Sequence, residues 1–230
     1  MFVALEVMSL PLYILVATAR RRRDISQEAA LKYFILGSFA SAFFLMGSAL
    51  LYGYSGGSLR LGQIAAAIPV VTGMDWLMML GVFMVMVGLL FKVAAFPFHE
   101  WTPDVYTGAP TPITGFMAAG VKVAAFGALL RFYVSVAGHL KWEFGLIFAL
   151  LAAATIIFGT LGGLVQRNIK RLLAYSSVAH AGFILIGVLA LTVGSAGATA
   201  FYLLTYGLAT IGAFAMVSPG RVQAPDGAIG

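Results

Sequence analysis

Cysteine is absent from this 230-residue sequence, and charged residues make up only 10% of it. The first absence excludes disulfides, thiolate metal sites and iron–sulfur ligation on this chain. The second excludes a water-soluble globular protein, in which charged residues are about a quarter of the total. A chain this poor in charge must be solvated by lipid.

What is present is mostly apolar: hydrophobic residues are 61% of the chain, and the mean hydropathy is +0.99. The apolar runs are continuous and do not alternate with polar residues, which predicts membrane-spanning helices and not barrel strands. The stretches run approximately over 1–19, 29–53, 74–97, 112–137, 144–165, 172–192 and 199–217. We therefore predict an all-α polytopic membrane protein with about seven transmembrane helices.

Basic residues cluster in two loops of this arrangement. Arg20–Arg23 follow the first stretch, and Arg167, Lys170 and Arg171 follow the fifth. Cytoplasmic loops are rich in Lys and Arg, and four crossings separate the clusters, so both are predicted on the cytoplasmic side. The net charge of +6 therefore indicates orientation in the bilayer and not binding to nucleic acid.

The two ends of the chain differ from the rest. Residues 218–230, SPGRVQAPDGAIG, are polar and rich in Pro and Gly, and we predict a disordered tail there after a transmembrane domain over 1–217. Because the chain also opens inside an apolar stretch, it reads as a piece of a longer protein.

Ionisable side chains inside the stretches are the candidate functional residues, since each costs about 2.5–3.5 kcal/mol at the centre of a helix. Lys122 lies near the middle of its stretch, from where its ammonium cannot reach the membrane surface. Glu6 precedes Arg20 by 14 residues, roughly 21 Å along a helix. We interpret both as functional; the alternatives are a lysine tied to carbonyls and a protonated acid that only joins helices.

Three further positions leave more alternatives open. Lys92 lies five residues before Pro97, so it is either functional or extends to the surface. His180 follows the hydroxyls of a Tyr-Ser-Ser run and either connects a water chain or only packs. Lys32 and Arg131 lie nearer the ends of their stretches, which favours anchors that extend towards the headgroups.

Residues 96–112, FPFHEWTPDVYTGAPTP, carry four prolines and cannot continue a regular helix. One interpretation is a polar loop with interfacial aromatic residues. The other is a discontinuous helix, which transporters use around ion sites.

Three segments, taken in order, resemble one family. Residues 89–132, LLFKVAAFPFHEWTPDVYTGAPTPITGFMAAGVKVAAFGALLRF, with the opening LEVMSLPLY and with QRNIKRLLAYSSVAHAG over 166–182, closely resemble subunit N of the proton-pumping NADH–quinone oxidoreductase, respiratory complex I. The resemblance covers about residues 1–217 but only the middle half of the family pattern, from about its fifth to its eleventh span. The run TPDVYTGAP favours subunit N over the M and L subunits, while the plastid-type counterpart stays open.

The resemblance implies an antiporter-like fold with inverted repeats and a broken helix. It matches Glu6 to the family's carboxylate, Lys92 to the lysine of the broken helix and Lys122 to the central lysine of the next span. His180 matches a family histidine. Together these four residues are expected to form a proton relay.

The function that the resemblance implies is proton translocation in the cell inner membrane, by a subunit of an NADH:quinone oxidoreductase. The expected partners are other membrane-arm subunits, lipid, protons and internal water. NADH, flavin, iron–sulfur clusters and quinone are expected on other subunits, with no cofactor and no redox chemistry here. The alternatives are a subunit of a cation/proton antiporter or of a membrane-bound hydrogenase, and a purely structural membrane-arm subunit.

Overall fold

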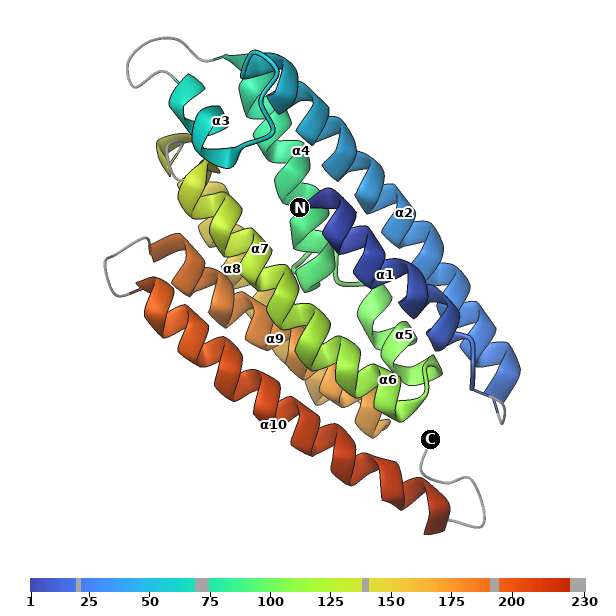
Figure 1. The fold of residues 1–230 in the computed structure, drawn as a ribbon. Coiled ribbons are helices and arrows are strands. Elements are labelled where there is room, and N and C mark those ends of the chain that lie inside the picture. Colours follow the sequence, from blue (N-terminus) through green and yellow to red (C-terminus); the bar gives the residue numbers. More distant parts are fainter. Residues whose placement is uncertain (20–21, 69–74, 138–140, 191–194, 224–230) are drawn as a thin grey trace.

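The computed structural model describes residues 1–19, 22–68, 75–137, 141–190 and 195–223. Its elements are α1 (Phe2–Val16), α2 (Arg23–Tyr54), α3 (Leu61–Ala67), α4 (Trp76–Val93), α5 (Trp101–Gly108), α6 (Thr111–Phe116), a π-helical turn (Met117–Val121), α7 (Lys122–Ser135), α8 (Lys141–Leu164), α9 (Ile169–Ala190) and α10 (Ser195–Gln223). The long helices run roughly parallel, with α10 along one outer side of the bundle (Figure 1).

The predicted spans are confirmed. Six helical segments are long and apolar enough to cross a membrane, and α1 is a shorter apolar helix at the place of the first predicted stretch. The segment over 111–135 counts as one span, because α6, the π turn and α7 follow each other without interruption. The structure differs at the end of the predicted domain, since α10 continues past residue 217 to Gln223. The rest of the predicted tail, 224–230, lies outside the described residues, as do Arg20 and Arg21.

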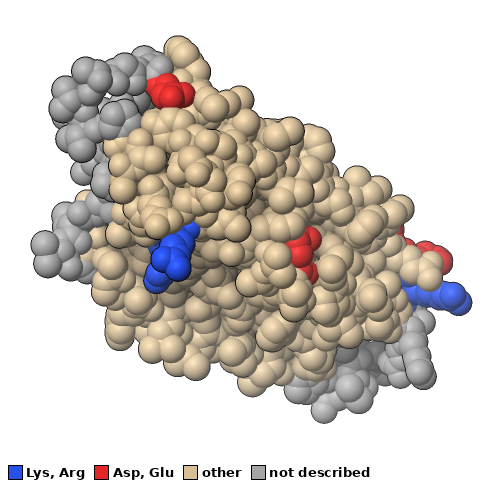
Figure 2. Space-filling view, turned by 45° about the horizontal axis from the view of Figure 1, so that its top comes forward, with Lys and Arg blue, Asp and Glu red and all other residues tan. Residues whose placement is uncertain are grey.

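The outer surface of the bundle is apolar, as contact with lipid requires. On α8, the exposed side chains of Leu146, Leu150, Ile157 and Leu161 recur at helical spacing and form one outward stripe. Figure 2 shows a face on which charged side chains are few and scattered. In this fold, therefore, the buried face and the lipid-exposed face of a helix are both apolar, and burial does not distinguish apolar from polar residues.

Small residues allow α8 and α9 to approach closely. A Cβ added at Gly182 of α9 would lie 2.6 Å from Cγ1 of Ile156 and 2.9 Å from the carbonyl oxygen of Ala152, both on α8. The absence of a side chain at this position sets the distance between the two helices.

Substituting Gly182→Ala is expected to destabilise the protein by about 1–3 kcal/mol, because backbone atoms of α8 cannot yield to the added methyl group. Thermal unfolding of the purified protein in detergent, followed by its helical circular dichroism, measures the effect. Gly127→Ala is the matched control, since nothing lies within 4 Å of its added Cβ. Equal unfolding midpoints for the two variants would contradict this account of the α8–α9 contact.

The proline-rich segment forms a discontinuous helix, and its interpretation as a polar interfacial loop is wrong. Helix α4 ends at Val93, the next residue, Ala94, has a left-handed backbone with φ 60°, and Pro97 follows a cis peptide bond. The chain then re-enters a helix at Trp101, which is buried and donates from its indole nitrogen to the carbonyl oxygen of Phe91 at 3.2 Å. This bond joins α5 back to α4 across the break.

The prolines of this segment lie where helices tolerate them. Pro103 is in the first turn of α5 and Pro112 is in the first turn of α6, where a missing N–H leaves no helical hydrogen bond unmade. Phe96, within the break, donates its N–H to Oγ1 of Thr155 on α8 at 3.0 Å. The break is therefore held by a neighbouring helix, as irregular backbone at membrane depth must be.

Candidate functional site

Glu6 and Lys92 form an ion pair between α1 and α4, in which the lysine is buried and the glutamate is half-buried. The Lys92 ammonium lies 3.4 Å from Oε1 of Glu6 and donates to Oγ of Ser9 at 2.7 Å. Oγ of Ser41, on α2, donates to the same Glu6 oxygen at 2.6 Å. The Lys92 side chain is only 5% exposed, so its ammonium does not extend to the membrane surface. Three helices thus share one positive and one negative charge in an apolar bundle.

Lys122 lies in a different setting, in which no carboxylate of the described residues pairs with it. It is 2% exposed, and its ammonium donates to the carbonyl oxygen of Ser177 at 2.6 Å and also to Oγ of that residue. The hydroxyl of Tyr206, on α10, donates to the same Oγ at 2.9 Å. Within the part of the chain that the structure describes, Ser177 is the only hydrogen-bond partner of the Lys122 ammonium. Its charge is therefore stabilised by dipoles and by the Tyr206 ring, whose centre lies 5.9 Å away.

The π turn over Met117–Val121 ends immediately before Lys122. Such turns are rare and occur mostly as single wide turns inside α-helices, often at functional sites. The buried lysine therefore begins α7 directly after a local change in helical geometry.

His180 lies one turn beyond Ser177 on α9 and faces α10. Its Nδ1 is 2.7 Å from the hydroxyl of Tyr202, and its ring centre is 5.1 Å from that of Tyr206. A cavity of about 420 Å³ between α9 and α10 opens beside these side chains. Its polar lining consists of Ser176, Ser177, His180, Tyr202, Thr205, Tyr206 and Thr210. These hydroxyls and the imidazole can hold a chain of water next to Lys122.

The structure thus brings the four predicted residues together in two groups. Glu6 and Lys92 form one, and Lys122 and His180 join through Ser177 and Tyr206 to form the other. Among the described residues, no hydrogen bond connects Lys92 directly with Lys122. Proton movement between the two groups would need water.

A charged network lies near the start of α2 and α9. The Asp104 carboxylate on α5 pairs with Lys32 at 2.8 Å and with Arg171 at 3.2 Å. Since Lys32 of α2 and Arg171 of α9 bind the same carboxylate, α2 and α9 begin at the same end of the bundle, as the predicted topology requires (Figure 1). Lys32 is more than a membrane anchor, whereas Arg131 is exposed, as an anchor would be.

Lys170 is predicted only as part of a basic loop that orients the chain in the bilayer, and its place in the structure is different. Its side chain is fully buried, and its ammonium donates to the carbonyl oxygens of Thr107 and Ala109 at the end of α5. Sequence reasoning missed it because a lysine in a basic loop is normally solvated. Ser9 and Tyr206, which also escaped prediction, lie on helices whose rotation the apolar pattern does not define.

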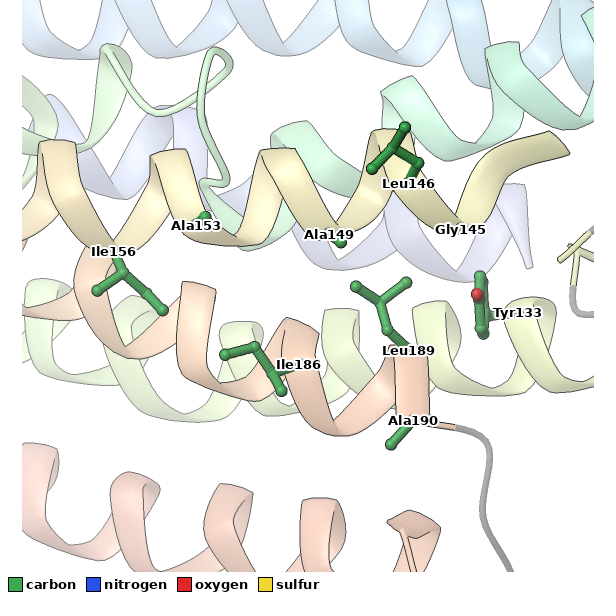
Figure 3. A pocket seen from close by; sticks show the side chains of 9 residues that line it. All are labelled: Tyr133, Gly145, Leu146, Ala149, Ala153, Ile156, Ile186, Leu189 and Ala190. Carbon is green, nitrogen blue, oxygen red and sulfur yellow. The ribbon is translucent and has the colours of Figure 1, made fainter. Parts of the chain in front are cut away.

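A second cavity, of about 1030 Å³, lies away from these groups. It is lined by Tyr133 of α7 and by small and aliphatic residues of α8 and α9, including Ala149, Ile156 and Ile186 (Figure 3). None of the four candidate residues lines it. Its apolar walls offer no path for a proton.

Comparisons with known proteins agree with this geometry. The family model described as "NADH:quinone oxidoreductase/Mrp antiporter, TM" matches residues 1–223. The chain is 57% identical over 227 residues to NADH-quinone oxidoreductase subunit N of Beutenbergia cavernae, covering 99% of this chain and 43% of that relative. It therefore spans less than half the length of the curated protein it matches.

Two solved structures share the fold. A chain of respiratory complex I from Thermus thermophilus with bound aureothin superposes with a TM-score of 0.79 at 49% identity, over 95% of this chain and 45% of that chain. A chain of the Mrp complex from Dietzia sp. gives a TM-score of 0.84 at 26% identity, over 94% and 40%. The antiporter-like fold and the resemblance to subunit N are thereby confirmed, and the chain belongs to the NADH:quinone oxidoreductase/Mrp antiporter transmembrane family.

Proposed function

We propose that this chain carries protons as a membrane-arm subunit of an NADH–quinone oxidoreductase in the cell inner membrane. The observation that carries the proposal is the pair of buried lysine sites, one with a carboxylate and one without. Each buried charge has a cost in a lipid-solvated bundle, and structural packing alone does not require it. Energy would come from quinone reduction in other subunits, which would also hold the redox cofactors.

In the proposed relay, protons pass from the Glu6–Lys92 pair through water to Lys122, and on to the cavity beside His180. The Glu6 carboxylate stabilises the positive charge of Lys92 at a separation of 3.4 Å. A change in that separation would alter how readily Lys92 gives up a proton. Lys122 then receives the proton and passes it towards the hydroxyl-lined cavity.

A cation/proton antiporter is the second candidate function, and the fold of the Mrp complex is similar. Identity favours the first candidate, at 57% to a subunit N against 26% to the Mrp chain. The third possibility, a purely structural subunit, requires that the buried lysines can be neutralised without loss of pumping.

Inverted membrane vesicles that carry the assembled complex distinguish the first two functions. NADH is expected to drive proton uptake in sodium-free buffer, and uptake should cease when quinone reduction is inhibited. Adding sodium without NADH should leave an imposed proton gradient unchanged. Sodium-dependent exchange without NADH, lost on Lys122→Ala, would instead establish the antiporter.

A further inference from the structure

Lys170 is a fully buried lysine that the proposed relay does not use. It is 0% exposed, and its ammonium donates to the carbonyl oxygen of Ala109 and, at 3.4 Å, to that of Thr107. Helix α5 ends between these residues, at Gly108. The last carbonyls of a helix lack helical N–H partners and carry the negative end of its dipole, so a cation is favourable there. Lys170 therefore caps α5 from a different helix.

Other contacts hold α5 from both sides. Arg171, the residue after Lys170, pairs with Asp104 of α5, and Lys32 of α2 binds the other oxygen of that carboxylate. At Gly108, an added Cβ would lie 2.5 Å from Cβ of Ala29 on α2. The second half of the broken helix is thus fixed between α2 and the first turn of α9.

The same face of α9 also binds Lys122. Ser177 follows Lys170 by seven residues, which is two helical turns, and both are buried. Ser177 accepts from Lys122, while Lys170 donates to α5. Helix α8, packed closely on α9 at Gly182, accepts the N–H of Phe96 within the break between α4 and α5. One pair of helices therefore contacts the break, the carboxyl end of α5 and the central lysine.

We infer that Lys170 is a positioning residue: its buried ammonium holds the carboxyl end of α5, and through α9 it fixes the broken helix relative to the serine that binds Lys122. The coupling part of this inference rests on the proposed function, whereas the cap itself does not. The cap requires a positive charge at this position, but it does not require a group that gains and loses a proton.

The test uses the assembled complex with Lys170→Met, Lys170→Arg and the control Arg167→Gln. Arg167 is exposed in the loop just before α9, so its substitution removes one cation without removing a cap. Hydrogen exchange of the α5 amides is measured together with protons pumped per NADH in inverted vesicles. Lys170→Met is expected to accelerate exchange near Ala109 by about tenfold and to lower the pumping ratio. Lys170→Arg should restore both, since a guanidinium keeps the charge and the donors.

Three results would overturn the inference. Exchange in Lys170→Met that matches Arg167→Gln would show that the ammonium does not hold α5. Protected amides with lost pumping in Lys170→Arg would show that Lys170 itself exchanges protons, because arginine cannot release one. Normal pumping in Lys170→Met despite faster exchange would remove the coupling to Lys122.

A measurement on the unsubstituted complex covers the case in which Lys170→Met fails to assemble. A water-soluble amine reagent should label Lys170 far more slowly than Lys32, whose side chain is 43% exposed at the same end of the bundle. Equal labelling rates would overturn the cap. Failure of the proposed relay is recognised separately, by normal pumping in Lys122→Ala, and leaves the exchange result of Lys170→Met intact.

Discussion

Replacing Lys122 with alanine in the assembled complex is expected to abolish NADH-driven proton pumping. The ammonium is the only ionisable group at the centre of its span. The neutral hydroxyls of Ser177 and Tyr206 cannot take up an additional proton in its place. Quinone reduction should fall as well, if electron transfer and pumping are obligatorily coupled. Both rates are measured in inverted vesicles, with the amount of assembled complex determined by native electrophoresis.

The control for this substitution lies on the same helix. Arg131→Ala removes an exposed cation from α7, so it should leave pumping and assembly unchanged. Unchanged pumping in Lys122→Ala, with normal assembly, would show that Lys122 only packs between helices and would contradict the proposed proton path.

Substituting Glu6→Gln is expected to have the second large effect, on stability as well as on pumping. It removes the negative charge and leaves the buried Lys92 ammonium with only neutral acceptors, the Ser9 hydroxyl and the glutamine amide oxygen. Removing one partner of a buried ion pair costs about 3–5 kcal/mol, and the lower end applies because the Glu6 side chain is 20% exposed. The thermal unfolding midpoint of the purified complex should fall, and pumping should slow.

A double substitution separates the loss of stability from the loss of pumping. Glu6→Gln with Lys92→Met removes both charges, so it should recover much of the stability without recovering pumping. Glu28→Gln is the matched control, because Glu28 pairs with Lys32 at a side-chain exposure of 63%. If the double variant pumped normally, neither Glu6 nor Lys92 would belong to the relay.

The sequence predicts the spans of this fold well, because apolar runs of sufficient length have no other stable state in a bilayer. It also predicts that no regular helix continues through the prolines of 96–112, although it leaves open whether a polar loop or a discontinuous helix forms there. It identifies Lys122 as buried from its distance to both ends of its span. The sequence does not predict the interhelical partners of these residues. Lys92 meets Ser9 and Glu6, and Lys122 meets Ser177, only because of how each helix is rotated about its axis.

In a chain this apolar, the pattern of residues gives little information about the rotation of each helix about its axis. In a water-soluble helix the polar face marks the outside, whereas here the lipid-facing and buried faces of a helix such as α8 are both apolar. Lys170 illustrates the same limit from the other direction. It lies in the first turn of α9, directly after a basic loop, and only the tertiary placement of α5 buries it.

The wide turn before Lys122 determines which way that lysine points. A π turn contains one more residue than an α turn, and each residue of an α-helix advances the direction of the side chain by about 100°. The residues on the two sides of Met117–Val121 are therefore out of step by that angle. An uninterrupted α-helix over the same residues would move Lys122 only about 1.5 Å along the helix axis but turn its ammonium away from Ser177.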